Sequence, residues 1–434
     1  MSWGPKANLS ATAPPAETAV SSSLGSTRAR VSGLKLGRKT KEMDVLVTHG
    51  SGRIGYNIVR SLGRKGLSVA LGTDEFLGMA VLSRYTSARF RHPSFVHHPE
   101  EFILSLREAL CRFGPRVYIP AEQENLVVAR FLDRLNNLGI KIPIAPFATL
   151  RVLHKKDALV RLAKSVDVPV PETIVPSSLA EVRAFAREVG DPVVFKRLNS
   201  SSGRGVFYTT FRELESAENS AVVLGLPIGE FLMQKYVGGA GYGVSMLFHH
   251  GELRAKFTHK RLREREMSGG VSTLRLSVKN SLLEEYAERI LSCARFHGVA
   301  MVEFKYDEET KQGWVLEVNP RFWGSLALAI HAGVDFPYLL YRMALDGDVD
   351  PVFNYRTNVL GRWILGDTFT LLRRFGRNGH GGSPALPKPV AHVYDDFDWG
   401  DPQPFAGQLA FSACKYLRTL HYRPEDCEIC PDRL

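Results

Sequence analysis

Two apolar segments of the chain, residues 300–306 and 314–318, each carry one glutamate and are separated by a short polar stretch around Thr310. Apolar runs on both sides of a turn are typical of an antiparallel β-hairpin. Glu303 and Glu317 are equally far from Thr310 along the chain, so they are predicted to face each other with carbons about 5 Å apart. This pair therefore limits what the chain can form.

Facing carboxylates repel each other unless a cation lies between them or one of them keeps its proton. Mg²⁺ is such a cation, because it takes oxygen ligands and commonly binds one or two carboxylates together with phosphate oxygens. Asn319 shares a strand face with Glu317 and adds a neutral oxygen. Arg321 adds a fixed cation for a phosphate or a developing oxyanion. An exposed hairpin with solvated acids is the alternative, but the apolar Phe322 and Trp323 that follow are not typical of one.

Residues upstream of the hairpin supply groups that a triphosphate needs. Lys156 and Lys196 are candidate phosphate cations, and the Ser/Gly-rich residues 199–205 can offer hydroxyl and backbone N–H groups. This stretch does not end in Gly-Lys-Ser or Gly-Lys-Thr, so it is not a Walker loop, and a flexible hairpin turn is the alternative. Residues 234–237 end a predicted strand and can offer backbone groups to an adenine.

A glycine-rich turn near the start of the chain supports a second hypothesis. Gly50, Gly52 and Gly55 follow an apolar strand and open a helix, and Asp74 lies about 20 residues later, which is typical of a dinucleotide site. An NAD(P)-dependent oxidoreductase or epimerase is therefore the alternative function. Glycines are also needed in any tight strand-to-helix turn, and the chain has no Tyr-x-x-x-Lys motif.

The net charge of +11 raises a third hypothesis, a basic nucleic-acid-binding protein. Residues 1–42 hold seven basic and two acidic side chains, so +5 of this charge lies in one stretch rich in Ser, Ala, Thr, Pro and Gly. We expect that stretch to be disordered, with an organelle transit peptide as the alternative. The remaining +6 suits an enzyme of anionic substrates equally well. No apolar run approaches the roughly 18 residues of a membrane helix, and five cysteines favour a reducing, cytoplasmic location.

The order of apolar and polar segments predicts an α/β protein. Strands and helices alternate from residue 44 to about 150, which predicts a parallel sheet with helices, and a second unit begins near residue 151. Residues 351–434 are predicted to form a helical and irregular extension. The predicted strands are residues 45–47, 68–71, 117–120, 193–197 and 206–209, and the predicted helices are residues 101–113, 121–138, 156–165, 283–294 and 360–374.

Six motifs in order resemble the ATP-grasp superfamily, within its group of carbamoyl-phosphate-synthase-like and biotin-carboxylase-like ATP-dependent carboligases. They are Lys156 with Val168-Pro169-Val170-Pro171, Val194-Phe195-Lys196 with the Ser/Gly stretch, Met233-Gln234-Lys235-Tyr236-Val237, Ser268-Gly269-Gly270-Val271-Ser272-Thr273, Glu303-Phe304, and Glu317-Val318-Asn319-Pro320-Arg321. The resemblance covers residues 44 to 350. It implies a Rossmann-like pre-ATP domain (43–150) whose glycine turn faces substrate, and then a two-lobed ATP-grasp domain (151–350) of α+β type with a lid over about 151–235.

The same resemblance implies a role for each motif. Phosphates would be bound by Lys156, Lys196, Ser201, Ser202 and Gly203, the adenine by Gln234, Lys235 and Val237, and Mg²⁺ (or Mn²⁺) by Glu303, Glu317 and Asn319. Arg321 would stabilise the transferring phosphoryl group. The family often has an acidic ribose ligand shortly after the adenine strand, but residues 238–242 contain no acid. ATP would convert a carboxylate into an acyl phosphate, which an amine, or less often a thiol, then attacks.

The substrates are expected to be small molecules whose identity the sequence does not indicate. Among the basic residues Lys260, Arg261, Arg263 and Arg265, we expect Arg263 and Arg265 to bind an acceptor carboxylate, with a solvated charge run as the alternative. Glu122, and with it Glu124, is a candidate for the substrate side. On this reading no nucleic acid or membrane partner is expected, and an oligomer is left open.

Overall fold

The protein is described here from a computed structural model that covers residues 42–198, 205–216, 227–265, 270–375, 388–418 and 434. The tail predicted to be disordered lies outside these residues except for Glu42. Ser201, Ser202 and Gly203 of the expected phosphate loop also lie outside them. No described helix is long and apolar enough to cross a membrane.

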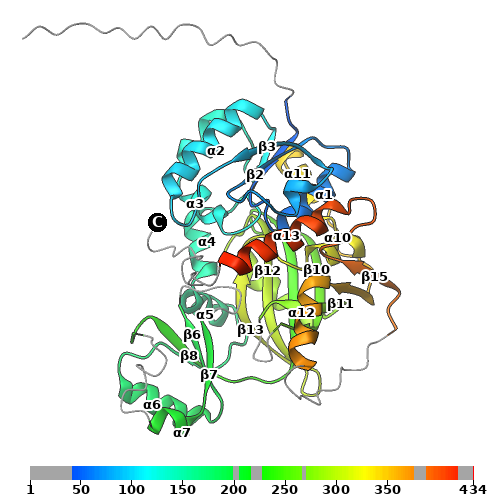
Figure 1. The fold of residues 1–434 in the computed structure, drawn as a ribbon. Helices are drawn as coiled ribbons and strands as arrows, with labels where there is room; N and C mark the ends of the chain where they lie inside the picture. Colours follow the sequence, from blue (N-terminus) through cyan, green and yellow to red (C-terminus); the bar gives the residue numbers. More distant parts are fainter. Residues whose placement is uncertain (1–41, 199–204, 217–226, 266–269, 376–387, 419–433) are drawn as a thin grey trace, which may run out of the picture. The chain divides into compact units, whose positions relative to one another are not determined.

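The first α/β layer is a four-stranded parallel sheet in the order β3-β2-β1-β4. Its strands β2 and β3 lie near helices α1 and α2 in the upper part of Figure 1. The predicted helix over residues 121–138 is wrong in length, because α3 ends at Arg130 and short 3-10 turns follow. The sequence pattern does not indicate the edge strand β3, because every second side chain faces solvent and two of its six residues are Arg. The elements are β1 (Val45–Val47), α1 (Arg53–Arg64), β2 (Val69–Thr73), β3 (Thr86–Arg91), α2 (Pro99–Phe113), β4 (Val117–Ile119), α3 (Glu124–Arg130), α4 (Phe147–His154) and α5 (Lys156–Ser165).

A smaller antiparallel sheet, in the order β5-β8-β6-β7, forms a lobe within the region that is expected to be the lid. Phe195 and Met233 come from its two middle strands and are fully buried against helix α6, so the lobe has an apolar core of its own. The carbonyl of Pro169, just before the lobe, accepts the N–H of Val315 at 3.0 Å. The elements are β5 (Thr173–Ile174), α6 (Leu179–Val189), β6 (Val193–Arg197), β7 (Val206–Thr209), α7 (Phe211–Ser216) and β8 (Phe231–Lys235).

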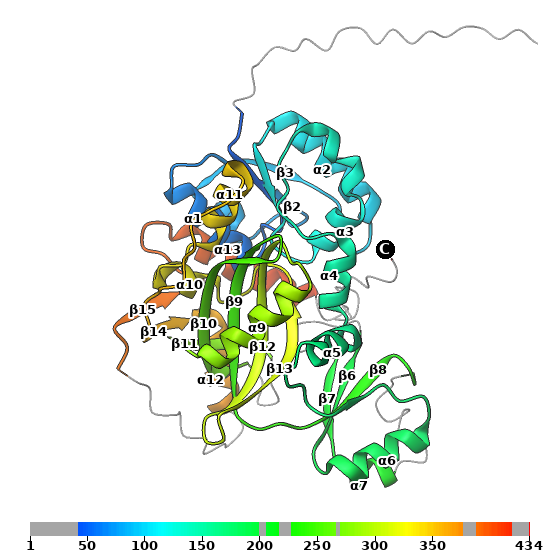
Figure 2. The same cartoon turned by 180° about the vertical axis from the view of Figure 1, so that it is seen from behind.

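The central sheet has seven strands in the order β13-β12-β9-β10-β11-β14-β15. Helix α9 covers one face of it (Figure 2), with Leu283, Ala287 and Ile290 fully buried at helical spacing. The elements are β9 (Ala240–His249), β10 (Glu252–Glu264), β11 (Ser272–Val278), α9 (Ser281–Cys293), β12 (Gly298–Asp307), β13 (Gln312–Asn319), α10 (Leu326–Ala332) and α11 (Phe336–Asp346), followed by β14, α12, β15 and α13 below.

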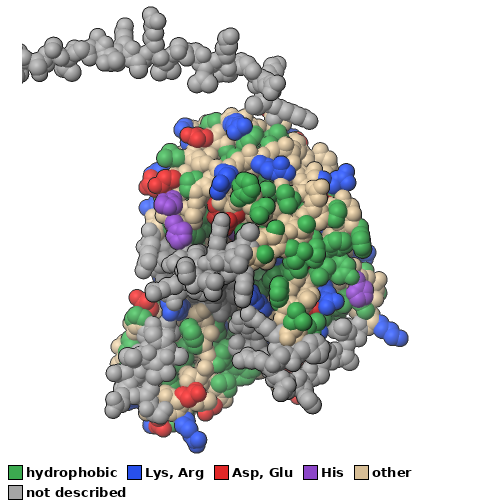
Figure 3. All heavy atoms as spheres, viewed as in Figure 1, with side chains coloured by type: hydrophobic (Ala, Val, Ile, Leu, Met, Phe, Trp, Pro, Cys, Tyr) green, Lys and Arg blue, Asp and Glu red, His purple; other side chains and the backbone are tan. Residues whose placement is uncertain are grey.

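The C-terminal part differs from the predicted helical and irregular extension, because it adds two strands to the central sheet. β14 (Val359–Arg362) pairs with β11, and β15 (Ala391–Tyr394) pairs with β14. Helix α12 (Ile364–Phe375) begins only after β14, and α13 (Gln403–Arg418) closes the described chain. Exposed apolar side chains occur on α12, on α13 and between them, and Figure 3 shows such side chains gathered on this face.

Trp323 anchors the core on the side of the central sheet that faces helices α10 and α11. Its ring is 1% exposed, stacks on Phe322 and meets the edge of Phe336 at a centroid distance of 5.1 Å. We expect Trp323→Ala to lower the free energy of unfolding by about 3–5 kcal/mol, because it opens a cavity the size of an indole. Urea unfolding followed by circular dichroism measures this loss. Trp399→Ala is the matched control, since Trp399 is 86% exposed, and an equal loss in both variants would contradict the prediction.

Candidate metal and phosphate site

The predicted acid pair is present in the register of β12 and β13. Glu303 pairs with Glu317, and Met301 pairs with Asn319 two residues along the strands. Beyond Glu303 the register shifts by one residue, which is a β-bulge, and the strands then run to a turn at Asp307–Gln312. The prediction that the two glutamates face each other across the hairpin is therefore confirmed.

Glu303 is held by two neighbours. The amide of Asn319 donates to one carboxylate oxygen at 3.1 Å, and Arg261 Nη2 contacts the other at 2.6 Å. Arg321 Nη2 in turn donates to Asn319 Oδ1 at 2.9 Å, and its Nη1 donates to the carbonyl of Phe322 at 2.9 Å. A chain of charged and amide groups thus fixes the positions of Glu303 and Arg321, two groups expected to meet phosphate or metal.

Two buried lysines lie within electrostatic reach of the acid pair. Lys156 begins α5 and is 4% exposed, and Lys196 lies on β6 and is 9% exposed. Burial, with Lys156 in addition, lowers the pKa of Lys196 to about 8, against the opposing effect of Glu317 and Glu303. Burial and the charge of Glu303 raise the pKa of Glu317, against the lysines and Arg321.

These groups form a compact mixed-charge site. Ammonium groups taken out of water are costly unless anions compensate them, and the two carboxylates here already repel each other. A dication between the carboxylates and a polyanion along the lysines would relieve both costs. The donor set of Glu303, Glu317 and Asn319 has the oxygen ligands that Mg²⁺ prefers. The residues present therefore fit this ion.

The expected adenine strand is β8. Gln234 is 3% exposed, and its side-chain amide donates to Thr173 Oγ1 at 2.9 Å. Lys235 forms a surface ion pair with Glu172 at 3.0 Å, and its backbone N–H donates to the carbonyl of Glu172 at 2.9 Å. Val237 lies just beyond the strand, where its backbone is not in the sheet. Gln234 is thus engaged by Thr173 and Lys235 by Glu172, whereas Val237 lies outside the strand.

Arg263 lies elsewhere than expected. Its Nη1 contacts both carboxylate oxygens of the buried Asp367, at 2.7 and 2.8 Å, so it ties β10 to α12 and is not available to a substrate. Arg265 is exposed at the end of β10. Arg261, from the same basic run, is the residue that reaches Glu303. The register of β10 shifts on both sides of Arg263, and such bulges re-aim side chains away from simple alternation.

Glu122 belongs to a second polar cluster next to Arg321. His49 Nε2 lies 3.3 Å from Glu122 Oε1. Burial opposes ionisation of Glu122, but His49, Arg321 and Arg53 outweigh it and lower the pKa of Glu122 to about 2. Burial likewise opposes protonation of His49, but Glu122 above all raises the pKa of His49 to about 9. Glu124 is fully buried and binds the backbone N–H groups of residues 121 and 122, so it supports Glu122 without facing a substrate.

His49 and Arg53 were not predicted, although both lie in the glycine turn. The turn needs glycine for packing, because a Cβ at Gly55 would lie 2.3 Å from the carbonyl oxygen of His49. The carbonyl of Gly50 accepts the N–H of Ala80, which occupies part of the turn. Arg53 points away, to the carbonyl of Gly324 at 3.0 Å. The turn therefore has a structural explanation that does not require a dinucleotide.

Comparisons with known proteins concern the fold and one segment of the sequence. Residues 228–364 match the family model described as ATP-grasp in the biosynthetic pathway with Ter operon. One solved structure of similar fold is the complex of biotin carboxylase from Campylobacter jejuni with β,γ-ATP. It superposes on this chain with a TM-score of 0.59 at 16% identity, covering 74% of each chain.

Two further solved structures are similar in fold. The biotin carboxylase domain of 2-oxoglutarate carboxylase from Hydrogenobacter thermophilus, solved with MgADP and bicarbonate, has a TM-score of 0.58 at 16% identity over 74% of each chain. The N5-carboxyaminoimidazole synthase of Aspergillus clavatus, solved with ADP and 5-aminoimidazole ribonucleotide, has a TM-score of 0.55 at 16% identity over 71% of this chain and 78% of the other. Likeness at this identity concerns the fold.

Proposed function

We propose that this chain, which has the ATP-grasp fold, is an ATP- and Mg²⁺-dependent ligase that joins a carboxylate to an amine. The observation that carries the proposal is the pair Glu303 and Glu317, which face each other in register beside the buried Lys156 and Lys196. Solved proteins of similar fold bind MgADP with bicarbonate, or ADP with an aminoimidazole ribonucleotide, which supports a reaction between an acid and an amine.

In this proposal each group of the site has one task. Mg²⁺ would be held by Glu303, Glu317 and Asn319, and when bound it would neutralise the charge of the nucleotide's phosphates. Lys156 and Lys196 would bind phosphate oxygens. The backbone of Val237, just beyond β8, would bind the adenine, because the backbone of Gln234 and Lys235 is paired within the sheet. Mn²⁺, with the same preference for oxygen, is the alternative ion.

Arg321 would stabilise the phosphoryl group while it moves from ATP to the substrate carboxylate. Two hydrogen bonds fix its guanidinium before any substrate arrives, so no reorganisation is needed during transfer. The product of this step, an acyl phosphate, reacts with the amine: a C–N bond forms, the bond from the acyl carbon to the phosphate oxygen breaks, and phosphate leaves with the electron pair. The lid lobe would keep water out, because acyl phosphates hydrolyse easily.

The substrate side would be the cluster of His49 and Glu122. The pKa of Glu122 is lowered to about 2, so its carboxylate is ionised at neutral pH. It could therefore bind the ammonium group of an acceptor near Arg321. Arg265, which is exposed, remains the candidate from β10 for a substrate carboxylate. The substrates would be small molecules that carry these charges.

The function is tested by a coupled assay of ADP release with pairs of amino acids and small acids. The ligase predicts that ADP release requires Mg²⁺ and both substrates, and that Mg-ATP raises the melting temperature while NADH does not. An NAD(P) oxidoreductase predicts the reverse ligand preference. A nucleic-acid-binding protein predicts salt-sensitive retention on DNA after deletion of residues 1–42. Failure of Mg-ATP to bind would overturn the proposal.

The pKa of Lys196 gives the ligase a specific pH dependence. Because this pKa is lowered to about 8, Lys196 is charged below pH 8 and loses its charge as the pH rises further. The apparent KM for Mg-ATP is therefore expected to rise about tenfold between pH 7 and 9. Lys196→Arg, which stays charged, should abolish this rise, and steady-state kinetics over this range measures it. The same pH dependence in both proteins would contradict the assignment of Lys196.

A further inference from the structure

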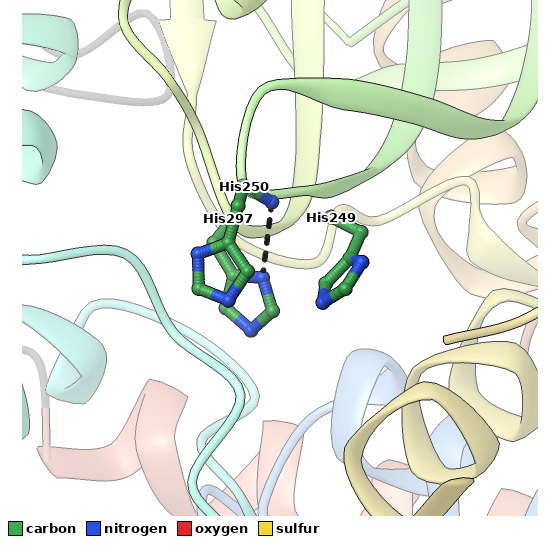
Figure 4. Close-up of side chains that lie close together, drawn as sticks. All are labelled: His249, His250 and His297. Carbon is green, nitrogen blue, oxygen red and sulfur yellow. Dashed lines mark hydrogen bonds between the residues drawn. The ribbon is translucent and has the colours of Figure 1, made fainter. Parts of the chain in front are cut away.

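A second cluster of potential ligands lies at the far end of β9 and β12 from the acid pair. His249 ends β9, His250 lies in the turn to β10, and His297 directly precedes β12. The ring centroids are 4.7, 5.5 and 4.2 Å apart, and one ligand nitrogen from each ring lies within 4.8 Å of the other two. Figure 4 shows the rings of His250 and His297 stacked on each other, with the ring of His249 beside them.

The backbone holds these three positions together. β9 pairs with β10 on one side and with β12 on the other, so the ends of all three strands meet here. The N–H of Gly251 donates to the carbonyl of Phe296 at 2.7 Å, which ties the turn to the loop before β12. The N–H of His250 lies 3.4 Å from Nδ1 of His297. The cluster is thus built on strand ends and a tight turn, which suits a fixed binding site.

Asp348 contacts one histidine of the cluster, His249. Its Oδ1 lies 3.4 Å from Nδ1 of His249, and Arg254 holds both of its carboxylate oxygens at 2.7 Å. A carboxylate on one ring nitrogen fixes the tautomer and the orientation of an imidazole, and this leaves the other nitrogen as a ligand. His249 therefore has the support that metal-binding histidines commonly have. Its side chain is 25% exposed, so an ion can reach it.

We propose that His249, His250 and His297 bind a divalent transition-metal ion of the Zn²⁺ class. Three imidazoles with an open fourth position are typical ligands of such ions, whereas Mg²⁺ takes oxygen ligands. Tetrahedral Zn²⁺ needs ligand nitrogens about 3.4 Å apart, and the exposed His250 can turn to close the remaining gap.

This site is distinct from the proposed Mg²⁺ site. His297 directly precedes β12 and Glu303 lies midway along it, six positions later, which corresponds to about 20 Å of extended strand. The ligands at the two sites also differ in chemistry. A soft to borderline ion at the imidazoles would tie β9, β10 and β12 together, and its binding does not depend on the ligase function.

The test is titration of the whole chain, without a histidine tag, with ZnCl₂ in excess Mg²⁺ by calorimetry, and with Co²⁺ by visible absorption. The wild type is expected to bind one Zn²⁺ that His250→Asn and His297→Gln bind at least about tenfold more weakly. Asn suits position 250 because its φ is 49°, a left-handed conformation that Asn tolerates. Asp348→Asn should weaken binding by a smaller factor.

The controls separate this site from other ligands. His98→Asn alters an exposed histidine that pairs with Glu101, and it should bind Zn²⁺ as the wild type does. The five cysteines are unchanged in every variant, so any Zn²⁺ they bind is common to all. Circular dichroism and the Mg-ATP melting shift should not change in His250→Asn. Wild-type Zn²⁺ affinity in His250→Asn and His297→Gln, or no Zn²⁺ bound by the wild type, overturns the proposal.

Discussion

Replacing Glu317 by glutamine is expected to lower Mg-ATP-dependent ADP release by about 100-fold or more while the fold stays intact. The substitution removes one of the two facing carboxylates, so the proposed dication loses a charged ligand. The same change relieves repulsion in the free protein, because burial and Glu303 raise the pKa of Glu317. A carboxyl with a raised pKa opposes folding at neutral pH when it is ionised, and glutamine is always neutral. We therefore expect the melting temperature without ligand to be unchanged or higher.

The opposite signs of these two effects distinguish a ligand from a structural residue. Melting curves with and without Mg-ATP, together with kcat for ADP release, measure both. Glu308→Gln is the matched control: it changes an acid of the same hairpin that is half exposed and contacts Lys260 and Tyr242. ADP release by Glu317→Gln at the wild-type rate would refute the metal assignment.

The hairpin could be predicted because its information is local. Apolar alternation and a polar turn fix which residues face each other, and the register of β12 and β13 agrees at Glu303 and Glu317. Helix α5 was predicted with the bounds Lys156–Ser165, since Pro residues follow it closely. The strands β6 and β7 of the smaller sheet were also predicted with their observed bounds.

The C-terminal strands could not be predicted because their partners are distant in the sequence. Leu360 of β14 pairs with Leu276 of β11, and a short apolar run there reads equally well as the start of a helix. Asp396 then accepts the N–H groups of Ile364 and Leu365 and begins α12. An aspartate in a Gly/Pro-rich stretch gives no local sign of this role.

The same limit applies to the site. Arg261 and Arg263 are two residues apart, so alternation places them on one face, but bulges in β10 send Arg263 to Asp367 and leave Arg261 at Glu303. The pairing of His49 with Glu122 joins two loops far apart in the sequence. Composition and spacing identified the acids and lysines, and only the fold shows which basic residues meet them.

Arg321→Lys is expected to lower kcat by about 10²–10³-fold with only a small change in KM for Mg-ATP. Lysine keeps the charge but cannot donate at once to Phe322 O and Asn319 Oδ1, as the two Nη atoms of Arg321 do. The cation would then have to find its position during phosphoryl transfer, which costs more in the transition state than in the bound substrate. Steady-state kinetics with Mg-ATP and a productive pair of substrates separates kcat from KM.

Arg289→Lys is the control, because Arg289 forms only an exposed pair with Glu285 and should keep wild-type kinetics.

The loss of fixed positive charge at residue 321 also removes one of the groups that lower the pKa of Glu122, so the acid limb of the kcat/KM profile should move to higher pH in Arg321→Ala. A purely structural residue would shift stability without moving this limb. If Arg321→Lys instead raises KM and leaves kcat unchanged, Arg321 binds the ground state of the nucleotide and does not act on the moving phosphoryl group.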